Sequence, residues 1–130
     1  MFEGASFNTF ENVKSKCYIG SKLPSTFDYA GNEIKVYDEP QEYFFNIQPV
    51  NTLTANAAEI QSFGENANKM KVAVITNRKK YEGKFKDFDC AYLDGVTPEG
   101  ETIHGQNANY RIYSVQPQNV IIRVFFIKLV

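Results

Sequence analysis

The stretch NYRIYSVQPQNVIIRVFFIKLV, residues 109–130, decides the fold class. Its first half alternates apolar and polar side chains, and its second half is almost continuously apolar. Both halves are rich in the β-branched and aromatic residues that favour strands. Gln116-Pro117-Gln118 lies between them and predicts a turn, because proline lacks the N–H group that a sheet ladder needs. The sequence therefore predicts that the chain ends in a hairpin of two antiparallel strands.

The second strand of this hairpin carries apolar residues on both faces. Because successive side chains of a strand point to opposite faces, two sets of four can be separated. One face has Val120, Ile122, Val124 and Phe126, and the other has Ile121, Phe125, Ile127 and Leu129. Such a strand needs cover on both sides. We expect a second sheet layer on one side and a helix or another subunit on the other.

A similar strand end occurs upstream in EYFFNIQPVN, residues 42–51. Pro49 ends this strand and leads into a long connection, residues 51–68, which we interpret as an insertion loop. Asn56 and Glu59 are spaced like a capping box, and Gly64 is a plausible helix end. One short helix is therefore predicted inside the loop.

Further strand patterns precede and follow the insertion loop. They cover residues 16–20, 28–37, 69–76 and 88–95, and in the second of these a turn at Ala30-Gly31-Asn32 is expected to lead into the strand. Residues 77–86 are expected to form a basic loop or ribbon. The fold class predicted is all-β: a mainly antiparallel small β-barrel or sandwich, with one short helix in the insertion loop. Residues 15–130 form its single domain. Residues 1–14 form an N-terminal arm, whose Phe2, Phe7 and Phe10 are expected to dock on the chain's own core or on a neighbouring subunit.

Composition excludes several classes of protein. The 130 residues carry a net charge of −1, whereas proteins that coat nucleic acid are usually basic. No stretch has the length and hydropathy of a membrane span or a signal peptide. Cys17 and Cys90 are too few for a disulfide framework, so we expect reduced thiols in a chain made in the cytoplasm. Cys90 alternates with Phe88 and Tyr92, which favours a place in the core.

The sequence offers little that could perform catalysis. His104 is the only histidine, and it lies in a connector rich in turn residues. No nucleophile and base are spaced as a pair, and no phosphate-binding or metal-binding motif is present. We therefore predict a protein that is not an enzyme, without catalytic residues, metal ligands or a cofactor.

Charge is distributed in blocks of opposite sign. Residues 69–86 contain seven Lys and Arg residues and one Glu, whereas residues 87–101 contain five acidic residues and no basic one. These blocks are either solvated faces of one barrel or complementary surfaces between copies. The candidate contacts with other subunits or partners are Arg78, Lys79, Lys80, Tyr81, Lys84, Asp87, Asp94, Glu99, Glu101 and Phe126.

Four short motifs follow one another in an order that resembles a known family. They are NIQP at 46–49, Phe63-Gly64, DCAYLDG at 89–95 and YRIYSVQPQN at 110–119. In this order they resemble the head-closure proteins, or stoppers, of the head–tail connectors of tailed bacteriophages. The resemblance covers roughly residues 36–129.

The resemblance implies a structural protein of the virion neck, made in the bacterial cytoplasm. Such proteins form a ring, usually a dodecamer, that continues the DNA channel, closes the filled head and docks the tail. The neighbours implied are an adaptor above the ring and a tail terminator or tail tube below it. Packaged double-stranded DNA would pass through without sequence specificity, and no membrane is involved. The candidate channel-loop residues are Asn56, Glu59, Gln61 and Glu65.

Three other functions remain open. The chain fits a tail terminator ring, which is also small and rich in β-structure. It fits a single-stranded nucleic-acid-binding β-barrel, because Tyr81, Phe85 and Phe88 stand among lysines. It also fits a barrel that carries a ligand in an aromatic cavity.

Overall fold

The C-terminal hairpin forms, but its turn lies further along the chain than predicted. The computed structural model describes residues 14–50 and 63–129, and in it strands β7 (Tyr110–Gln118) and β8 (Ile121–Lys128) pair antiparallel. The predicted turn at Gln116–Gln118 is wrong, because Pro117 lies inside β7 opposite Ile122. A proline is tolerated there because the far edge of β7 pairs with another described strand only at Tyr110 and Arg111. Asn119, with φ 52°, supplies the left-handed residue that the tight turn requires.

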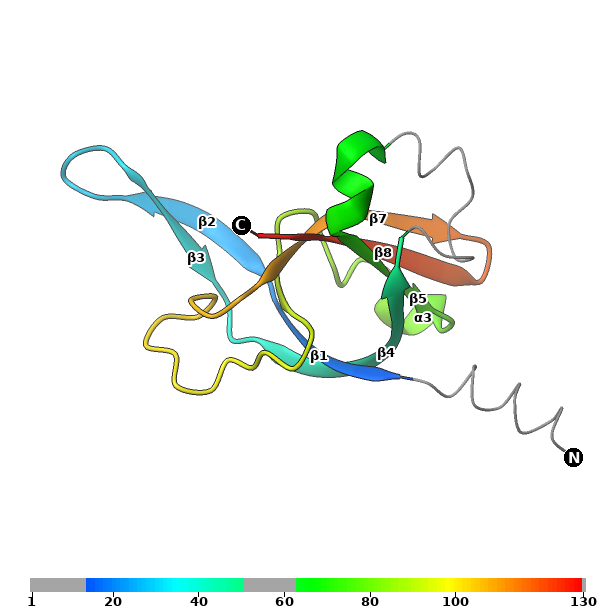
Figure 1. The fold of residues 1–130 in the computed structure, drawn as a ribbon. Helices are drawn as coiled ribbons and strands as arrows, with labels where there is room; N and C mark the ends of the chain where they lie inside the picture. Colours follow the sequence, from blue (N-terminus) through cyan, green and yellow to red (C-terminus); the bar gives the residue numbers. More distant parts are fainter. Residues whose placement is uncertain (1–13, 51–62, 130) are drawn as a thin grey trace, which may run out of the picture.

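Six strands close into a barrel, in the order β1-β4-β5-β8-β7-β6 (Figure 1). The remaining four are β1 (Ser15–Gly20), β4 (Gln41–Pro49), β5 (Met70–Ile75) and β6 (Cys90–Tyr92). All six neighbouring pairs are antiparallel. The predicted all-β fold class is confirmed, and the barrel form is the one adopted.

Strand β8 is covered on both faces, as its composition predicts. Ile122, Val124 and Phe126 point into the barrel core, which they share with residues such as Ile112. On the opposite face Phe125 packs against a second cluster that contains Val50, Phe63, Ala67, Met70 and Val72. Part of that cover comes from the 3-10 helix η1 (Gly64–Lys69) of the same chain. Phe126 is fully buried, so the expectation that its side chain contacts another subunit is wrong.

The predicted helix of the insertion loop lies mostly outside the described residues. Residues 51–62 are not described, and the described structure continues at Phe63. Gly64 has φ 61°, the left-handed conformation expected of a residue that ends a helix.

The basic segment after β5 begins with a short helix that the sequence did not indicate, and the predicted loop is present only after it, at residues 82–86. Arg78–Tyr81 form the short α-helix α3, and the Asn77 side chain caps it by accepting a hydrogen bond from the Lys80 N–H group. The Tyr81 ring packs against Phe45 and Phe85, at ring-centroid distances of 5.3 and 6.0 Å. This aromatic contact holds α3 on the barrel, which explains why a four-residue helix is stable there.

Strand β6 is much shorter than the predicted strand at 88–95, and the predicted alternation is wrong. Phe88 has φ 75° and therefore stands outside the strand. Cys90, Ala91 and Tyr92 are all buried, because both faces of β6 are covered. Ala91 faces the barrel core, whereas the Tyr92 hydroxyl reaches the connector and accepts a hydrogen bond from the Gly105 N–H group.

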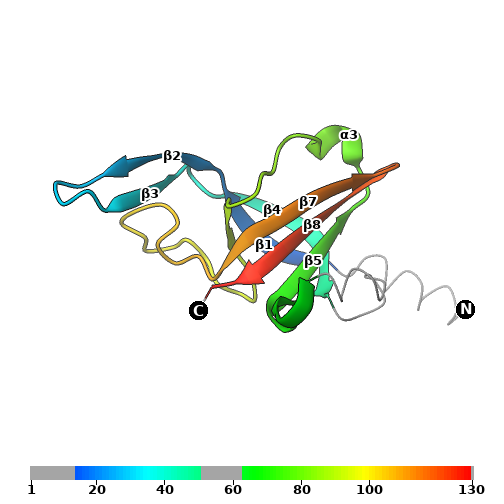
Figure 2. The same cartoon turned by 90° about the horizontal axis from the view of Figure 1, so that it is seen from above.

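A two-stranded hairpin projects from the barrel. Strands β2 (Lys22–Phe27) and β3 (Glu33–Tyr37) form a separate sheet, which Figure 2 shows extending away from the barrel strands. The turn predicted at residues 30–32 is present, and Gly31 has φ 86° in it. The sequence did not indicate β2, nor that the hairpin stands apart from the core. No helix of the described residues is long and apolar enough to cross a membrane.

Candidate interaction surfaces

The β2–β3 hairpin exposes large apolar side chains. It is called the arm below and is distinct from the N-terminal arm predicted at residues 1–14. Phe27 is 67% exposed, Tyr29 is fully exposed, and Leu23 and Ile34 are partly exposed. An isolated two-stranded hairpin is only marginally stable in water, and exposed apolar groups of this size usually mark a contact surface. The arm is therefore the strongest candidate for a surface that binds another protein.

The tip of the arm is organised around Asp28. One of its carboxylate oxygens accepts hydrogen bonds from the N–H groups of Ala30 and Asn32, each at 2.9 Å. The bond from the Asn32 N–H group contributes most, and together these bonds lower the pKa of Asp28. Its carboxylate is therefore charged at neutral pH. The neighbouring Phe27 and Tyr29 side chains are both exposed, so the tip presents two aromatic rings beside one negative charge.

The base of the arm is attached to the barrel through Asp89. Its carboxylate accepts hydrogen bonds from the N–H groups of Lys22 at 2.9 Å and Lys86 at 3.0 Å. Asp89 is almost fully buried, and this burial raises its pKa in spite of the two hydrogen bonds. The strand that begins at Lys22 is thus held at its first residue. Asp89 has a structural role and takes no part in a charged surface.

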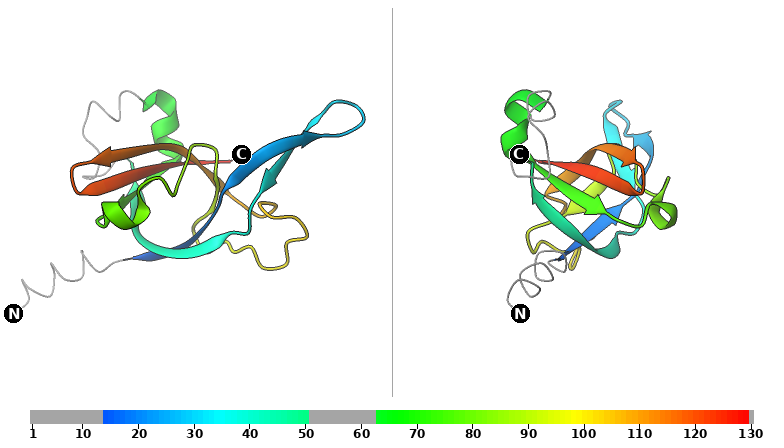
Figure 3. Two further views of the ribbon diagram at one scale, coloured as in Figure 1. Left: turned by 180° about the vertical axis from the view of Figure 1, so that it is seen from behind. Right: turned by 90° about the vertical axis from the view of Figure 1, so that its right-hand side faces the viewer.

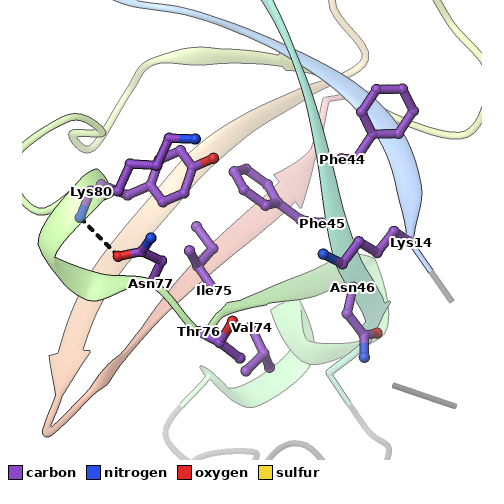
Figure 4. A pocket seen from close by; sticks show the side chains of 10 residues that line it. Lys14, Phe44, Phe45, Asn46, Val74, Ile75, Thr76, Asn77 and Lys80 are labelled. Carbon is purple, nitrogen blue, oxygen red and sulfur yellow. Dashed lines mark hydrogen bonds between the residues drawn. The ribbon is translucent and has the colours of Figure 1, made fainter. Parts of the chain in front are cut away.

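A groove of about 440 Å³ opens between β4, β5 and α3 (Figure 4). Phe45 and Ile75 are buried at its base, whereas Phe44 is 52% exposed. Lys14 and Lys80 carry the positive charges of the lining. The other lining residues are Asn46, Val74, Thr76, Asn77 and Tyr81. The groove thus combines apolar surface with two ammonium groups.

The arm and the groove lie on opposite sides of the molecule. Figure 1 and the left view of Figure 3 both place β2 and β3 on one side of the barrel, and α3 and the start of β1 on the other. The barrel therefore separates the tip of the arm from the groove of the same chain.

The basic segment residues predicted to contact other subunits or partners fall into two groups: those exposed to solvent and those that contact the chain's own fold. Lys79, Lys80 and Lys84 are exposed, as a contact surface requires. Arg78 instead pairs with Glu82 at 2.8 Å and donates to the Asn119 carbonyl oxygen at 2.8 Å, which connects α3 to the β7–β8 turn. Tyr81 is half-buried on the core. Only the three lysines of this set present free surface charge.

The acidic residues predicted to contact other subunits or partners also divide into exposed residues and residues that contact the chain's own fold. Asp87 and Glu99 are exposed. Asp94 forms an ion pair with Lys71 and accepts a hydrogen bond from the Tyr110 hydroxyl at 3.1 Å. Burial alone would raise the pKa of Asp94, but the hydrogen bond and charge of Lys71 outweigh it and lower this pKa. Asp94 therefore stabilises the chain's own fold.

Glu101 organises the connector between β6 and β7. Its Oε2 atom accepts hydrogen bonds from the Tyr92 hydroxyl and, at 2.6 Å, from the Asn107 N–H group. Burial, followed by the hydrogen bond to Glu101, raises the pKa of Tyr92. The connector and α3 lie at different ends of the barrel in Figures 1 and 2, so the acidic residues of the connector are well separated from the lysines of α3. Asp87 is not separated in this way, because it directly follows Lys86.

The candidate channel-loop residues fall mainly in residues 51–62, which are not described. Asn56, Glu59 and Gln61 lie outside the described residues, and Glu65 belongs to η1 without a described side chain. The predicted contact residues do not include those of the arm, and of the groove they include only Lys80 and Tyr81. The sequence did contain a pattern that indicates the arm. Phe27 and Tyr29 stand next to a predicted turn, where large apolar side chains are seldom covered by the core.

In the described part of the chain, the histidine and the two cysteines do not form a pair of nucleophile and base. His104 is exposed in the connector. Cys17 and Cys90 are free and buried, and burial raises the pKa of Cys17 to about 12 and that of Cys90 to about 11. Within residues 14–50 and 63–129, no three His, Cys, Asp or Glu side chains are grouped to hold a metal ion.

Comparison with known proteins gives a similarity in fold and nothing further. No protein-family model matches the chain, and no curated protein matches it. A similar solved structure is the solution structure of protein SF1141 from Shigella flexneri 2a, with a TM-score of 0.52 and 11% sequence identity. The alignment covers 91% of this chain and 94% of that chain. The two proteins therefore share an overall fold over almost their whole lengths.

Proposed function

We propose that the chain is a ring-forming subunit of the head–tail connector of a tailed bacteriophage. In this function it is part of the virion neck, where the ring continues the DNA channel, closes the filled head and docks the tail. Its partners are further copies of itself, an adaptor above and a tail terminator or tail tube below. DNA passes through without sequence-specific contacts, and the protein performs no catalysis.

The arm is the observation that carries this proposal. Large apolar side chains that are exposed beyond the core, as on this hairpin, usually mark a surface that contacts another molecule. A subunit of a ring needs such an element, because each copy must present to its neighbours surfaces that stay exposed in the free chain. The order of motifs along residues 36–129 supports the same function independently of the arm.

The test is reconstitution of particles. Filled heads made without this protein are incubated with the purified chain, and tail attachment is counted by electron microscopy. We expect the chain to bind to the heads and to restore tail attachment. The proposal is overturned if the folded chain neither binds these heads nor changes the number of tailed particles.

A matched pair of variants separates the arm from general surface effects. The double variant Phe27→Ala and Tyr29→Ala removes both exposed rings at the tip, whereas Val120→Ala removes an apolar side chain that is 74% exposed in the β7–β8 turn. We expect the double variant to lose at least tenfold in restored tail attachment and Val120→Ala to act like the unchanged chain. An equal loss in both would count against a role of the arm.

A second candidate is a barrel that binds single-stranded nucleic acid, and the groove favours it. Proteins of this class place lysines beside aromatic rings on which bases stack. Lys14, Lys80 and Phe44 offer a small version of this arrangement. The aromatic set expected from sequence does not form one surface, because Phe85 is buried and the Phe88 ring faces Arg111 at 4.9 Å. Salt-sensitive binding of an oligonucleotide, lost in Lys80→Glu, would favour this second function.

A further inference from the structure

The tip of the arm and the groove are complementary in chemistry. The tip presents the exposed rings of Phe27 and Tyr29, which flank Asp28 in the sequence. The groove presents an apolar lining, which includes Val74 and the half-buried Tyr81, together with the ammonium groups of Lys14 and Lys80. The Phe44 ring lies on the other side of β4 from Phe45 and forms only the outer rim (Figure 4). Rings inserted into the groove would be removed from water, and the carboxylate would meet an ammonium group.

The charges on the two surfaces are available for such a contact. Among the described residues, no carboxylate forms an ion pair with Lys14 or Lys80. The ammonium group of Lys80 lies 5.3 Å from the centroid of the Tyr81 ring, which directs it toward the groove lining. Asp28 accepts hydrogen bonds only from its own turn in the described structure, and these leave its outward side in water.

The position of the two surfaces determines what kind of contact they make. The tip and the groove of one chain lie on opposite sides of its barrel, so they cannot meet within one molecule (Figure 3). Two different surfaces that meet between copies make a head-to-tail contact, and repeated contacts of this kind close into a ring when the rotation allows.

We propose that the tip of the arm of one copy docks in the groove of the next, with Phe27 and Tyr29 against the apolar lining of the groove and with Asp28 beside Lys80. This inference rests on the proposed ring function, because it names the contact that joins neighbouring subunits. The base of the arm suits this role, since the hydrogen bond from the Lys22 N–H group to Asp89 holds the hairpin in a fixed direction.

Disulfide trapping tests the contact directly. Tyr29→Cys and Thr76→Cys are made as separate variants, which places one new thiol at the tip and one at the rim of the groove. The two variants are mixed in equal amounts at high concentration and treated with diamide as the oxidant. Because both native cysteines are buried, they give little background. We expect a disulfide-linked heterodimer as the main product.

The control mixture contains the same tip variant, Tyr29→Cys, and a second variant whose new thiol lies elsewhere. Glu99→Cys places it on the exposed connector, away from the groove. We expect at least tenfold less heterodimer with Tyr29→Cys in this mixture. Equal yields in the two mixtures, or no linked product with Thr76→Cys, overturn the inference. A product in which Tyr29→Cys links mainly to itself also overturns it, because the arms would then pair with each other.

The charge contact is tested by two neighbouring lysines of α3. Lys80 lines the groove, whereas Lys79 is equally exposed outside it. Adding Lys80→Glu to the Thr76→Cys variant should lower the trapping yield about tenfold, and adding Lys79→Glu should leave it unchanged. Asp28→Asn keeps the oxygen that caps the turn and removes the charge, so it should lower the yield as Lys80→Glu does. Equal effects of the two lysine variants would contradict the assignment of Lys80.

The outcomes separate this inference from the proposed function. If the chain restores tail attachment but the tip and groove thiols do not link, the docking contact is wrong and the ring function stands. If Lys80→Glu abolishes tail attachment without any tip-to-groove link, the groove binds a different neck protein and the inference is overturned. If the thiols link but the chain does not bind heads, head-to-tail association stands without the connector function.

Discussion

Gly105 of the connector lies directly against the ring of Tyr37, the last residue of β3. A Cβ atom at Gly105 would come within 2.5 Å of the Tyr37 Cδ2 atom, and Gly105 also has φ 91°. Together with the hydrogen bond from the Lys22 N–H group to Asp89, this contact secures both strands of the arm at its base. The direction of the arm is therefore set by the barrel and the connector.

Gly105→Ala should destabilise the protein more than the same change at another left-handed glycine. An alanine in this backbone region costs roughly 1–2 kcal/mol, and the clash with Tyr37 adds an overpacking cost of similar size. We expect a loss of about 3 kcal/mol in the free energy of unfolding, measured by urea denaturation. Gly31→Ala is the control, because Gly31 has φ 86° but nothing near its missing Cβ atom. Equal losses would show that Tyr37 yields to the new side chain.

Asp89→Ala should loosen the arm at its base. The change leaves the partly buried N–H groups of Lys22 and Lys86 without their acceptor, and an N–H group unpaired in this way costs roughly 1–3 kcal/mol. We expect a loss of about 3 kcal/mol in unfolding free energy and faster hydrogen exchange in β2. Asp87→Ala, which changes an exposed acid nearby, should have almost no effect. Unchanged exchange at Lys22 would contradict this role.

The pair of Asp94 and Lys71 should make stability depend on pH in the acid range. The pKa of Asp94 is lower in the folded chain than its ordinary value, so the folded state binds fewer protons than the unfolded state. The stabilisation is therefore present above the ordinary pKa of an aspartate and is lost as the pH falls through the folded-state pKa. Asp94→Asn should lower stability at pH 7 by roughly 0.5 kcal/mol, the size expected of an exposed pair. At a pH near 2 the difference in melting temperature between the two proteins should disappear.

The two cysteines should not react with thiol reagents in the folded protein. Both side chains are buried, and burial raises their pKa values to about 12 and about 11, so little thiolate is present at pH 8. We expect no colour with a chromogenic disulfide reagent in buffer and two equivalents of released thiolate in guanidinium chloride. Rapid reaction of one thiol in the native protein would show that the strand carrying it opens readily.

Phe126→Ala should act on folding and not on association alone. Phe126 is fully buried in the barrel core, and removing a buried phenylalanine ring costs about 3–5 kcal/mol. Urea denaturation of the variant measures this loss. Val120→Ala, in the exposed turn beside the same strand, should change the unfolding free energy by less than about 0.5 kcal/mol. A stable Phe126→Ala protein would contradict the position of this ring.

The elements predicted most accurately from sequence are those that local patterns specify. The apolar faces of β8 indicated cover on both sides, and the structure provides it from the barrel core and from η1. The turn at Gly31 was recognisable from its residues. Errors arose where tertiary contacts override a local pattern. Pro117 stays in β7 because that edge has no described partner strand beyond Arg111, and α3 is a helix because Tyr81 packs on Phe45 and Phe85.

The sequence by itself determined the class of fold, because alternation and β-branched content are properties of single strands. It also indicated that Cys90 belongs to the core. Only the tertiary structure decided which surfaces face outward together. Lys14, Phe44 and Lys80 come from three separate segments, and they share a groove only because the start of β1, β4, β5 and α3 meet there. The arm stands apart for the same reason: the barrel closes without β2 and β3, which leaves Phe27 and Tyr29 without cover from the core.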